Sequence, residues 1–220
     1  MSDIAVIIAV QDATRAKTRL GPDLDPAVRR NLVIAMLDDL LSAVREVHAG
    51  AILVVSADSV YDAFAREHAA SVLRDAGAGY NEALRTALAE TAGAMAVLIL
   101  PADLPHAAPA DLARLIDALR EPGVIVVPSE DGGTSALGLH PPGVIEPAFN
   151  GASAKRHIHA AAEAGAPCTV LDLDSLRIDI DTLEDLERVW PRVGEATTAL
   201  LEHLPLPAKG VGGGVGGSRE

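Results

Sequence analysis

The sequence is poor in aromatic side chains, in cysteine and in long apolar runs, and each shortage narrows what the protein can be. Aromatic residues make up 2% of the 220 residues and hydrophobic residues 49%, so we expect a folded domain with an aliphatic core. The single cysteine, Cys168, cannot form an internal disulfide; as a buried thiol it would fit a reducing, cytoplasmic setting. No apolar run approaches the roughly 20 residues of a membrane span, and the N-terminus does not resemble a secretion signal. A soluble protein without a membrane partner is therefore predicted.

Positive charge is also scarce, with 18 Lys and Arg against 31 Asp and Glu and a net charge of −13. This balance argues against nucleic acid as a partner, because phosphate backbones are bound by clustered cations. A single nucleotide needs only a few local cations, and three of them, Arg15, Lys17 and Arg19, directly follow the first predicted strand. They could neutralise a triphosphate. The segment is not a P-loop, because the glycines of that motif are missing. The alternative interpretation is an exposed charged loop.

Apolar runs of strand length alternate with segments of helical period along most of the chain. The alternation predicts one α/β domain over residues 1–204, with a mostly parallel sheet flanked by helices. The interrupted stretch 124–173 predicts one or two late antiparallel strands, and the Gly-rich residues 205–220 predict a disordered tail. Strands are expected at 4–10, 51–56, 71–74, 94–100, 124–128, 134–139 and 169–173. Helices are expected at 26–48, 60–68, 153–164, 183–189 and 195–203. Two further helices are expected, one that begins at about residue 81 and one that follows 101–109 and ends at 120.

Carboxylates stand where two of these segments end, and open parallel sheets bind ligands at the carboxyl ends of their strands. Asp103 comes just after a predicted buried strand and lies between two prolines, Pro101 and Pro105. Magnesium prefers one or two such carboxylates together with phosphate oxygens and water. The alternative is that Asp103 only stabilises a turn or caps a helix. Residue alternation places Asp179 and Asp181 on the same face of an extended segment. Either could be a second metal ligand, or one of them caps the helix that follows.

Three glycine-containing turns complete the candidate set. The turn at 75–81 permits close backbone approach and leads into a helix N-terminus, but a plain tight turn explains it equally well. The segments 132–136 and 150–157 offer hydroxyls and amides, and the second opens a helix at which Ser153 is either the N-cap or part of an anion site. His157, one turn later, is predicted to be a surface or packing residue.

The combination of these motifs suits metal-assisted phosphoryl or nucleotidyl transfer. Such reactions need charge stabilisation and alignment of the reactants but no protein nucleophile. Ser-His-Asp, Cys-His and zinc-binding patterns are absent from the sequence.

In order and spacing, the motifs resemble those of the 2-phospho-L-lactate and phosphoenolpyruvate guanylyltransferases, which act in the biosynthesis of the deazaflavin coenzyme F(420). The resemblance covers about residues 4–189. It depends on the whole set of motifs: Ala16–Leu20, Ala35–Leu40, Gly77–Leu84, Ala102–Pro105, Gly133–Leu137, Ser153–His157 and Asp179–Thr182.

This resemblance implies a single-domain fold of the nucleotide-diphospho-sugar transferase type. The phosphate of the acid would attack the α-phosphorus of GTP and expel pyrophosphate. Phosphoenolpyruvate is favoured over 2-phospho-L-lactate as the acceptor, and a homodimer is left open. The resemblance implies four groups of site residues: Lys17, Arg19 and Asp103 for catalysis; Arg15, Lys17, Arg19, Gly79 and Asn81 for GTP; Thr134, Gly151 and Ser153 for the small phosphorylated carboxylic acid; and Asp103 with Asp179 or Asp181 for Mg²⁺.

The sequence departs from the family pattern at three places. Gln11 and Asp12 stand where a lysine is frequent, Tyr80 replaces an aliphatic residue, and Asn150 separates Phe149 from the glycine that usually follows it directly. Two other functions remain open. One is a different nucleotidyltransferase of the same fold, such as a molybdenum-cofactor guanylyltransferase or a cytidylyltransferase. The other is a non-catalytic protein that binds a nucleotide or a phosphorylated acid.

Overall fold

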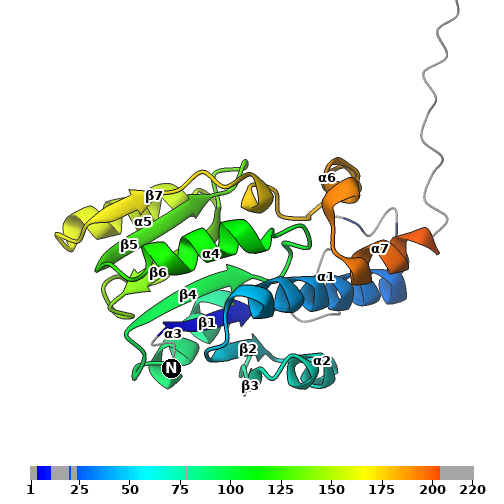
Figure 1. Ribbon diagram of the computed structural model, residues 1–220, viewed down its shortest axis with the longest axis horizontal. Helices are drawn as coiled ribbons and strands as arrows, with labels where there is room; N and C mark the ends of the chain where they lie inside the picture. The colour runs from blue at the N-terminus through cyan, green and yellow to red at the C-terminus, as the bar shows by residue number, and fades with distance from the viewer. Residues whose placement is uncertain (1–3, 11–19, 21–23, 78, 204–220) are drawn as a thin grey trace, which may run out of the picture.

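A seven-stranded sheet forms the centre of the protein (Figure 1). The computed structural model describes residues 4–10, 20, 24–77 and 79–203, so the predicted tail at 205–220 lies outside the described residues. The strand order is β3-β2-β1-β4-β6-β5-β7. The strands are β1 (Ile4–Ala9), β2 (Ile52–Ser56), β3 (Ser71–Arg74), β4 (Ala96–Pro101), β5 (Gly123–Pro128), β6 (Thr134–His140) and β7 (Cys168–Val170).

Strand direction confirms the prediction of a mostly parallel sheet. β1 pairs in parallel with β2 and β4, β2 with β3, and β5 with β7. β6 runs antiparallel between β4 and β5, so it is the late antiparallel strand that the sequence predicts. β1 is buried along its whole length, as expected for a nearly continuous apolar run covered on both faces.

Helices cover both faces of the sheet, and alternate side chains of β1 divide between two clusters. Ile4, Val6 and Ile8 belong to the larger cluster, on the face covered by α1 and α4. Ala5, Ile7 and Ala9 belong to the smaller cluster, with residues of α3 and α5. The helices are α1 (Pro26–Val47), α2 (Asp62–Glu67), α3 (Tyr80–Glu90), α4 (Pro109–Ala118), α5 (Ser153–Glu163), α6 (Leu183–Val189) and α7 (Glu195–Glu202).

The start of α1 has two features that are typical of a helix N-terminus. The Asp25 side chain accepts a hydrogen bond from the backbone amide of Ala27 at 2.8 Å, and Pro26 is the first helical residue. Within the described residues, no helix is both long and apolar enough to span a membrane.

The prediction for the last strand and its cysteine was wrong in two respects. β7 ends at Val170, and the chain then forms a short 3-10 turn at Asp174–Leu176. Cys168 is exposed rather than buried, because β7 pairs with β5 alone, at the edge of the sheet, and all three of its residues face solvent. Leu173 is apolar and fully buried, but it packs into the core from outside the sheet.

Candidate active site

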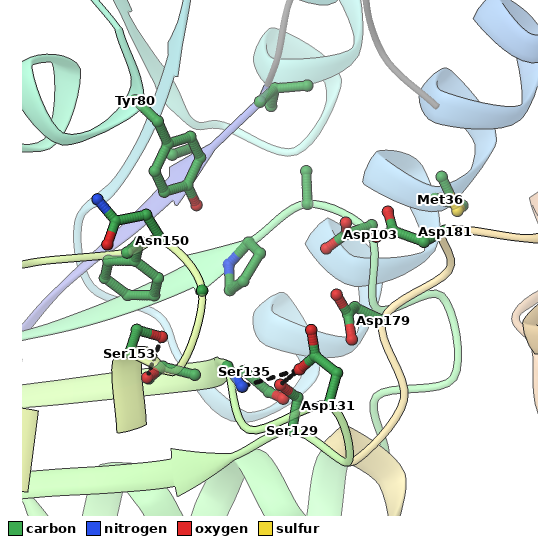
Figure 2. A pocket seen from close by; sticks show the side chains of 18 of the residues that line it. Met36, Tyr80, Asp103, Ser129, Asp131, Ser135, Asn150, Ser153, Asp179 and Asp181 are labelled. Carbon is green, nitrogen blue, oxygen red and sulfur yellow. Dashed lines mark hydrogen bonds between the residues drawn. The ribbon is translucent and has the colours of Figure 1, made fainter. Parts of the chain in front are cut away.

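A pocket of about 380 Å³ opens at the carboxyl ends of β1 and β4 (Figure 2). This size falls within the range of small-molecule sites. Figure 2 shows Asn150 and Ser153 on one side of the pocket and Asp103 and Asp181 on the other. The structure brings six of the predicted site residues into its lining: Asp103, Thr134, Gly151, Ser153, Asp179 and Asp181.

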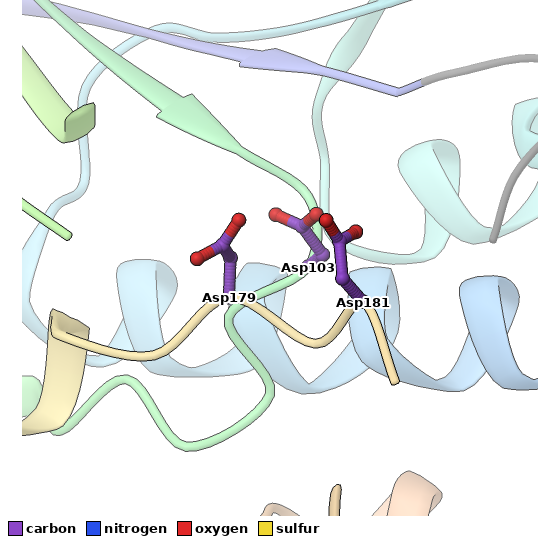
Figure 3. A group of neighbouring side chains, drawn as sticks. All are labelled: Asp103, Asp179 and Asp181. Carbon is purple, nitrogen blue, oxygen red and sulfur yellow. The ribbon is translucent and has the colours of Figure 1, made fainter. Parts of the chain in front are cut away.

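Three of these residues form a compact acidic cluster (Figure 3). Asp103, Asp179 and Asp181 each place a carboxylate oxygen within 4.8 Å of the others. The cluster follows from the extended segment before α6, in which Ile178 and Ile180 are buried and the intervening aspartates turn toward the pocket. The predicted alternation is therefore present. These three groups could hold a metal ion.

The cap of α6 decides between the two interpretations of these aspartates. Thr182 is the N-cap, and its hydroxyl accepts from the backbone amide of Asp185 at 3.2 Å. The Asp185 carboxylate accepts in return from the Thr182 amide at 2.8 Å, which completes a capping box. Neither Asp179 nor Asp181 is the N-cap, so both carboxylates are placed for the pocket.

Burial and neighbouring negative charges together raise the pKa of Asp179. Burial raises the pKa of its carboxyl to about 6, and the nearby charge of Asp103 adds to the effect, followed by smaller contributions from Asp131 and Asp181. A carboxylate that is costly to ionise beside two others is stabilised by a bound cation. The electrostatics therefore agree with the geometry of a cation site.

The opposite side of the pocket carries hydroxyl groups. Thr134 begins β6 and Ser153 begins α5, and both side chains are buried with their oxygens 2.8 Å apart. The interpretation of Ser153 as the N-cap was wrong, because Ala152 occupies that position and Ser153 is the first helical residue. Its hydroxyl bonds to Thr134 instead of to the helix backbone. Gly151, just before the helix, has φ +47°, a left-handed conformation that suits glycine.

His157 is a polar residue of this region to which the sequence assigned no role in the site. It lies one turn after Ser153 on α5, fully buried. Its Nδ1 atom is 3.0 Å from the Thr134 hydroxyl, and its Nε2 atom accepts from the Ala148 amide at 2.9 Å. Burial lowers the pKa of the imidazole to about 4, so the ring is neutral at pH 7. The spacing of four residues from Ser153, which puts both on one helix face, is the signal that could have identified it.

Two residues of α3 hold the loop before α5 in place, one through hydrogen bonds and one through a ring contact. The Asn81 amide accepts from the Phe149 backbone N–H at 2.8 Å and donates to the Phe149 carbonyl at 3.4 Å. Tyr80 packs edge-on against the Phe149 ring, with 5.7 Å between ring centroids, and lines the pocket. Gly79, with φ +109°, is the N-cap of α3. Gly79 and Asn81 do not belong to the described pocket lining, and their contact with a nucleotide stays a prediction.

Arg15, Lys17 and Arg19, in the predicted triphosphate loop, lie outside the described residues, and their role also stays a prediction. The described chain ends before this loop at Val10, which lines the pocket, and resumes at Leu20, which is fully buried.

The turn between β5 and β6 adds pocket residues that were not predicted. Asp131 accepts at 2.8 Å from the Gly133 amide and at 2.5 Å from the Ser129 hydroxyl. Both oxygen-bearing side chains line the pocket beside Ser135. Their signal in the sequence, an aspartate before two glycines, is that of an ordinary turn, so the pattern did not distinguish a site from a loop.

Comparison with known proteins now decides the family. A family model described as "Guanylyl transferase CofC like" matches residues 4–204. The chain belongs to this family. A phosphoenolpyruvate guanylyltransferase of Sphaerobacter thermophilus is 39% identical over 86% of this chain and 93% of its own length. A 2-phospho-L-lactate guanylyltransferase of Methanothermobacter thermautotrophicus is 36% identical over 88% of this chain and 86% of its own.

Solved structures confirm the expected fold. A Desulfovibrio desulfuricans protein described as a nucleotide-diphospho-sugar transferase superposes with a TM-score of 0.75 at 19% identity, over 92% of this chain and 95% of its own. A nucleotidyl transferase of Methanothermobacter thermautotrophicus superposes with a TM-score of 0.65 at 16% identity, over 90% of this chain and 98% of its own. A Mycobacterium tuberculosis protein, solved as a complex with manganese, superposes with a TM-score of 0.53 at 20% identity, over 86% of this chain and 99% of its own. Together with the family, they identify this CofC-like chain as an enzyme of the nucleotidyltransferase type.

Proposed function

We propose that this CofC-like enzyme transfers GMP from GTP to the phosphate of phosphoenolpyruvate or 2-phospho-L-lactate and releases pyrophosphate, in coenzyme F(420) biosynthesis. One observation carries the proposal: a single pocket holds a carboxylate cluster on one side and a hydroxyl-lined helix start on the other. This arrangement suits a reaction between two phosphorylated molecules, one of them bound through a metal ion. The names of the curated relatives supply the acids.

The acidic cluster fits magnesium as the cation. Its donors are carboxylate oxygens, which magnesium prefers, and the pKa of Asp179 is raised by burial and by the neighbouring negative charges, an effect that a bound divalent cation would relieve. Asp103, Asp179 and Asp181 would hold the ion. When bound, it would neutralise phosphate oxygens of the nucleotide and stabilise the charge that develops during transfer.

The hydroxyl side would receive the acid. Ser153 and Thr134 lie beside the first backbone amides of α5, and a helix N-terminus attracts anions. Gly151 lets the backbone turn into this helix. An oxygen of the acid's phosphate forms a bond to the α-phosphorus of GTP, and the bond from that phosphorus to the bridging oxygen of pyrophosphate breaks. The chain aligns these two groups without forming a covalent intermediate.

The nucleotide contacts complete the proposal. Lys17 and Arg19 would act on the triphosphate together with Arg15, because their charges suit phosphate oxygens. Gly79 and Asn81 are proposed to lie near the guanosine, as the family resemblance implies. Phosphoenolpyruvate is our first choice of acid, since the relative from Sphaerobacter carries that name at 39% identity.

The test offers the purified full-length chain each of the four nucleoside triphosphates with Mg²⁺, paired in turn with phosphoenolpyruvate, 2-phospho-L-lactate and 3-phosphoglycerate. Pyrophosphate release is measured, and the diphosphate-linked product is identified by mass spectrometry. We expect release with GTP and one of the first two acids. Release with CTP instead would support a different nucleotidyltransferase of this fold. Absence of release with GTP and every acid would overturn the proposal.

A further inference from the structure

The imidazole of His157 lies directly behind the hydroxyl side of the pocket. It is fully buried and is not part of the pocket lining. Each ring nitrogen has a partner: Nδ1 faces the Thr134 hydroxyl at 3.0 Å, and Nε2 faces the Ala148 backbone nitrogen at 2.9 Å. The ring also contacts Phe149 edge-on, with 5.1 Å between ring centroids. The histidine therefore joins the start of β6 to the loop that precedes α5.

These contacts fix the tautomer of the ring. A backbone N–H can only donate, so the Nε2 atom that receives the Ala148 amide must carry a lone pair. In a neutral imidazole the proton then resides on Nδ1, and burial keeps the ring neutral by lowering its pKa to about 4. Nδ1–H consequently donates to the Thr134 hydroxyl oxygen.

The direction of this first hydrogen bond determines the next. Among the described residues, the Thr134 hydroxyl bonds to His157 and to Ser153, at 3.0 and 2.8 Å. Since it accepts from the histidine and is buried, its own proton is satisfied by donation to the Ser153 oxygen. Ser153 lines the pocket, so the proton of its hydroxyl is left for a group inside the pocket.

We propose that His157 is a positioning residue for the phosphorylated acid: through Thr134 it orients the Ser153 hydroxyl so that a hydrogen, and not a lone pair, faces the pocket. Phosphate and carboxylate oxygens at neutral pH only accept hydrogen bonds, so a serine held in this direction is ready to bind them. A lone pair in the same place would repel the anion. This inference rests on the proposed function, because it takes the acid to bind beside Ser153.

Two substitutions of His157 distinguish the hydrogen bond made by Nδ1 from the one made by Nε2. In His157→Asn the side-chain amide reaches about as far as Nδ1, so it can still donate to Thr134 but no longer meets the Ala148 amide. In His157→Gln the amide reaches about as far as Nε2, so it can still accept from Ala148 but leaves Thr134 without its donor. Both replacements are neutral and polar, and each removes one of the two bonds.

Steady-state kinetics with GTP and the acid provide the first measurement. We expect His157→Gln to raise the KM for the acid about 10-fold, roughly one hydrogen bond to a charged group, with the KM for GTP changed less than about 2-fold. His157→Asn is expected to recover most of the affinity, with a KM for the acid within about 3-fold of the parent enzyme. Equal effects of the two variants, or a parallel rise in both KM values, would overturn the proposal and indicate a purely structural role.

A double-mutant cycle gives the second measurement. If His157 acts through Ser153, the substitution His157→Gln should raise the KM for the acid less than about 2-fold when Ser153 is already alanine. The proposal fails if the two effects multiply in full. Thermal unfolding of each variant is recorded alongside, so that a loss of folded protein is recognised.

The tautomer itself is tested without any turnover. Nitrogen-15 NMR of histidine-labelled protein, with His157→Asn used to assign the signal, should show a neutral ring protonated at Nδ1. A ring protonated at Nε2 would overturn the inference. This readout distinguishes the two failures, because inactivity with every acid would refute the proposed function and leave the tautomer as an independent result.

Discussion

The backbone amide of Ile180 donates a hydrogen bond to the carbonyl oxygen of Asp103 at 3.2 Å. This bond joins the turn after β4 to the segment before α6, which lie far apart in the sequence. Ile180 is fully buried, so the core fixes the separation between the aspartates of that segment and Asp103. The acidic cluster is thus built into the fold and does not depend on long side chains reaching from the surface.

Removing one carboxylate from this cluster should abolish most of the activity. We expect Asp103→Asn to lower kcat/KM for GTP by on the order of 100-fold or more, because a metal ion contributes several kcal/mol to such transfers. Pyrophosphate release at several Mg²⁺ concentrations measures the effect. Asp117→Asn is the matched control, since Asp117 is an exposed residue of α4. A variant at position 103 with normal turnover and normal Mg²⁺ dependence would contradict the assignment.

The raised pKa of Asp179 predicts that replacing this carboxyl group stabilises the protein when no divalent metal ion is present. The pKa of Asp179 is raised to about 6, so the stability that its neutral form provides is lost as the pH rises through that value. At pH 7 without divalent ions, Asp179→Asn should therefore raise the free energy of unfolding, by about 1 kcal/mol and a few degrees in Tm. Calorimetry in EDTA checks this.

Added Mg²⁺ provides the internal control for that measurement. It should raise the Tm of the parent protein, because binding to the folded state stabilises it, and should raise the Tm of Asp179→Asn much less. A lower Tm of the variant in EDTA would show that Asp179 is a structural group and not a strained ligand.

Asn81 offers a choice between two functions. Its amide holds the backbone of Phe149, next to the proposed acid site, whereas the family resemblance places it near the guanosine. We expect Asn81→Ala to raise the KM for the acid about 10-fold, because the loop before α5 loses two hydrogen bonds, and to raise the KM for GTP as well, because the proposed guanosine contact is lost. Separate KM values for acid and GTP decide the matter. A rise in the KM for GTP alone would favour a direct nucleotide contact.

Two of the buried histidines, His106 and His157, should make the protein sensitive to acid. The pKa values of His106 and His157 are lowered to about 4, mainly by burial, from 6.5. At these two side chains the unfolded chain therefore binds more protons than the folded one as the pH falls from about 6.5 to about 4, so both should lower the free energy of unfolding over this range, whereas the raised pKa of Asp179 acts in the opposite direction. Urea titrations at a series of pH values measure it. His106→Leu should flatten the dependence, and an unchanged slope would contradict the role of His106.

The sequence predicted the features that repeat along the chain. Alternating strand-length and helix-period runs gave the α/β sheet, and the two-residue period of Ile178 to Asp181 gave the direction of the aspartates. Asp103 was predicted because it follows the buried strand β4. These are local patterns that a chain can show without its partners. The cationic residues before Leu20 remain predictions.

Features that depend on distant contacts were missed or misjudged. The prediction for His157, a surface or packing residue, included its packed position but missed its hydrogen bonds, because its partners Thr134 and Ala148 come from other segments. Cys168 was expected inside the protein, since its apolar run does not reveal that β7 lies at the edge of the sheet. Ser153 was read as a possible N-cap because serine is common there, while its hydroxyl in fact bonds across to β6.

The last helix depends on a cap supplied from another helix. α7 lies against α1 (Figure 1), and the buried Asp39 carboxylate accepts from the backbone amides of Ala196 and Thr197 at 2.8 and 3.0 Å. These bonds satisfy two of the amides that every helix N-terminus leaves without a partner. Gly194 is required beside them, because a Cβ atom there would lie 2.3 Å from the Asp39 carboxyl carbon.

Asp39→Ala should therefore lower the free energy of unfolding by about 1–3 kcal/mol, the cost of leaving buried donors unsatisfied. Gly194→Ala should destabilise the same contact through the clash, and the two effects should be less than additive because they disturb one interaction. Urea unfolding of the two single variants and the double variant measures this, with exposed Asp117→Asn as the control. Full additivity would show that Gly194 and Asp39 act independently. A Tm of Asp39→Ala equal to that of the parent would show that α7 is held by its apolar contacts alone.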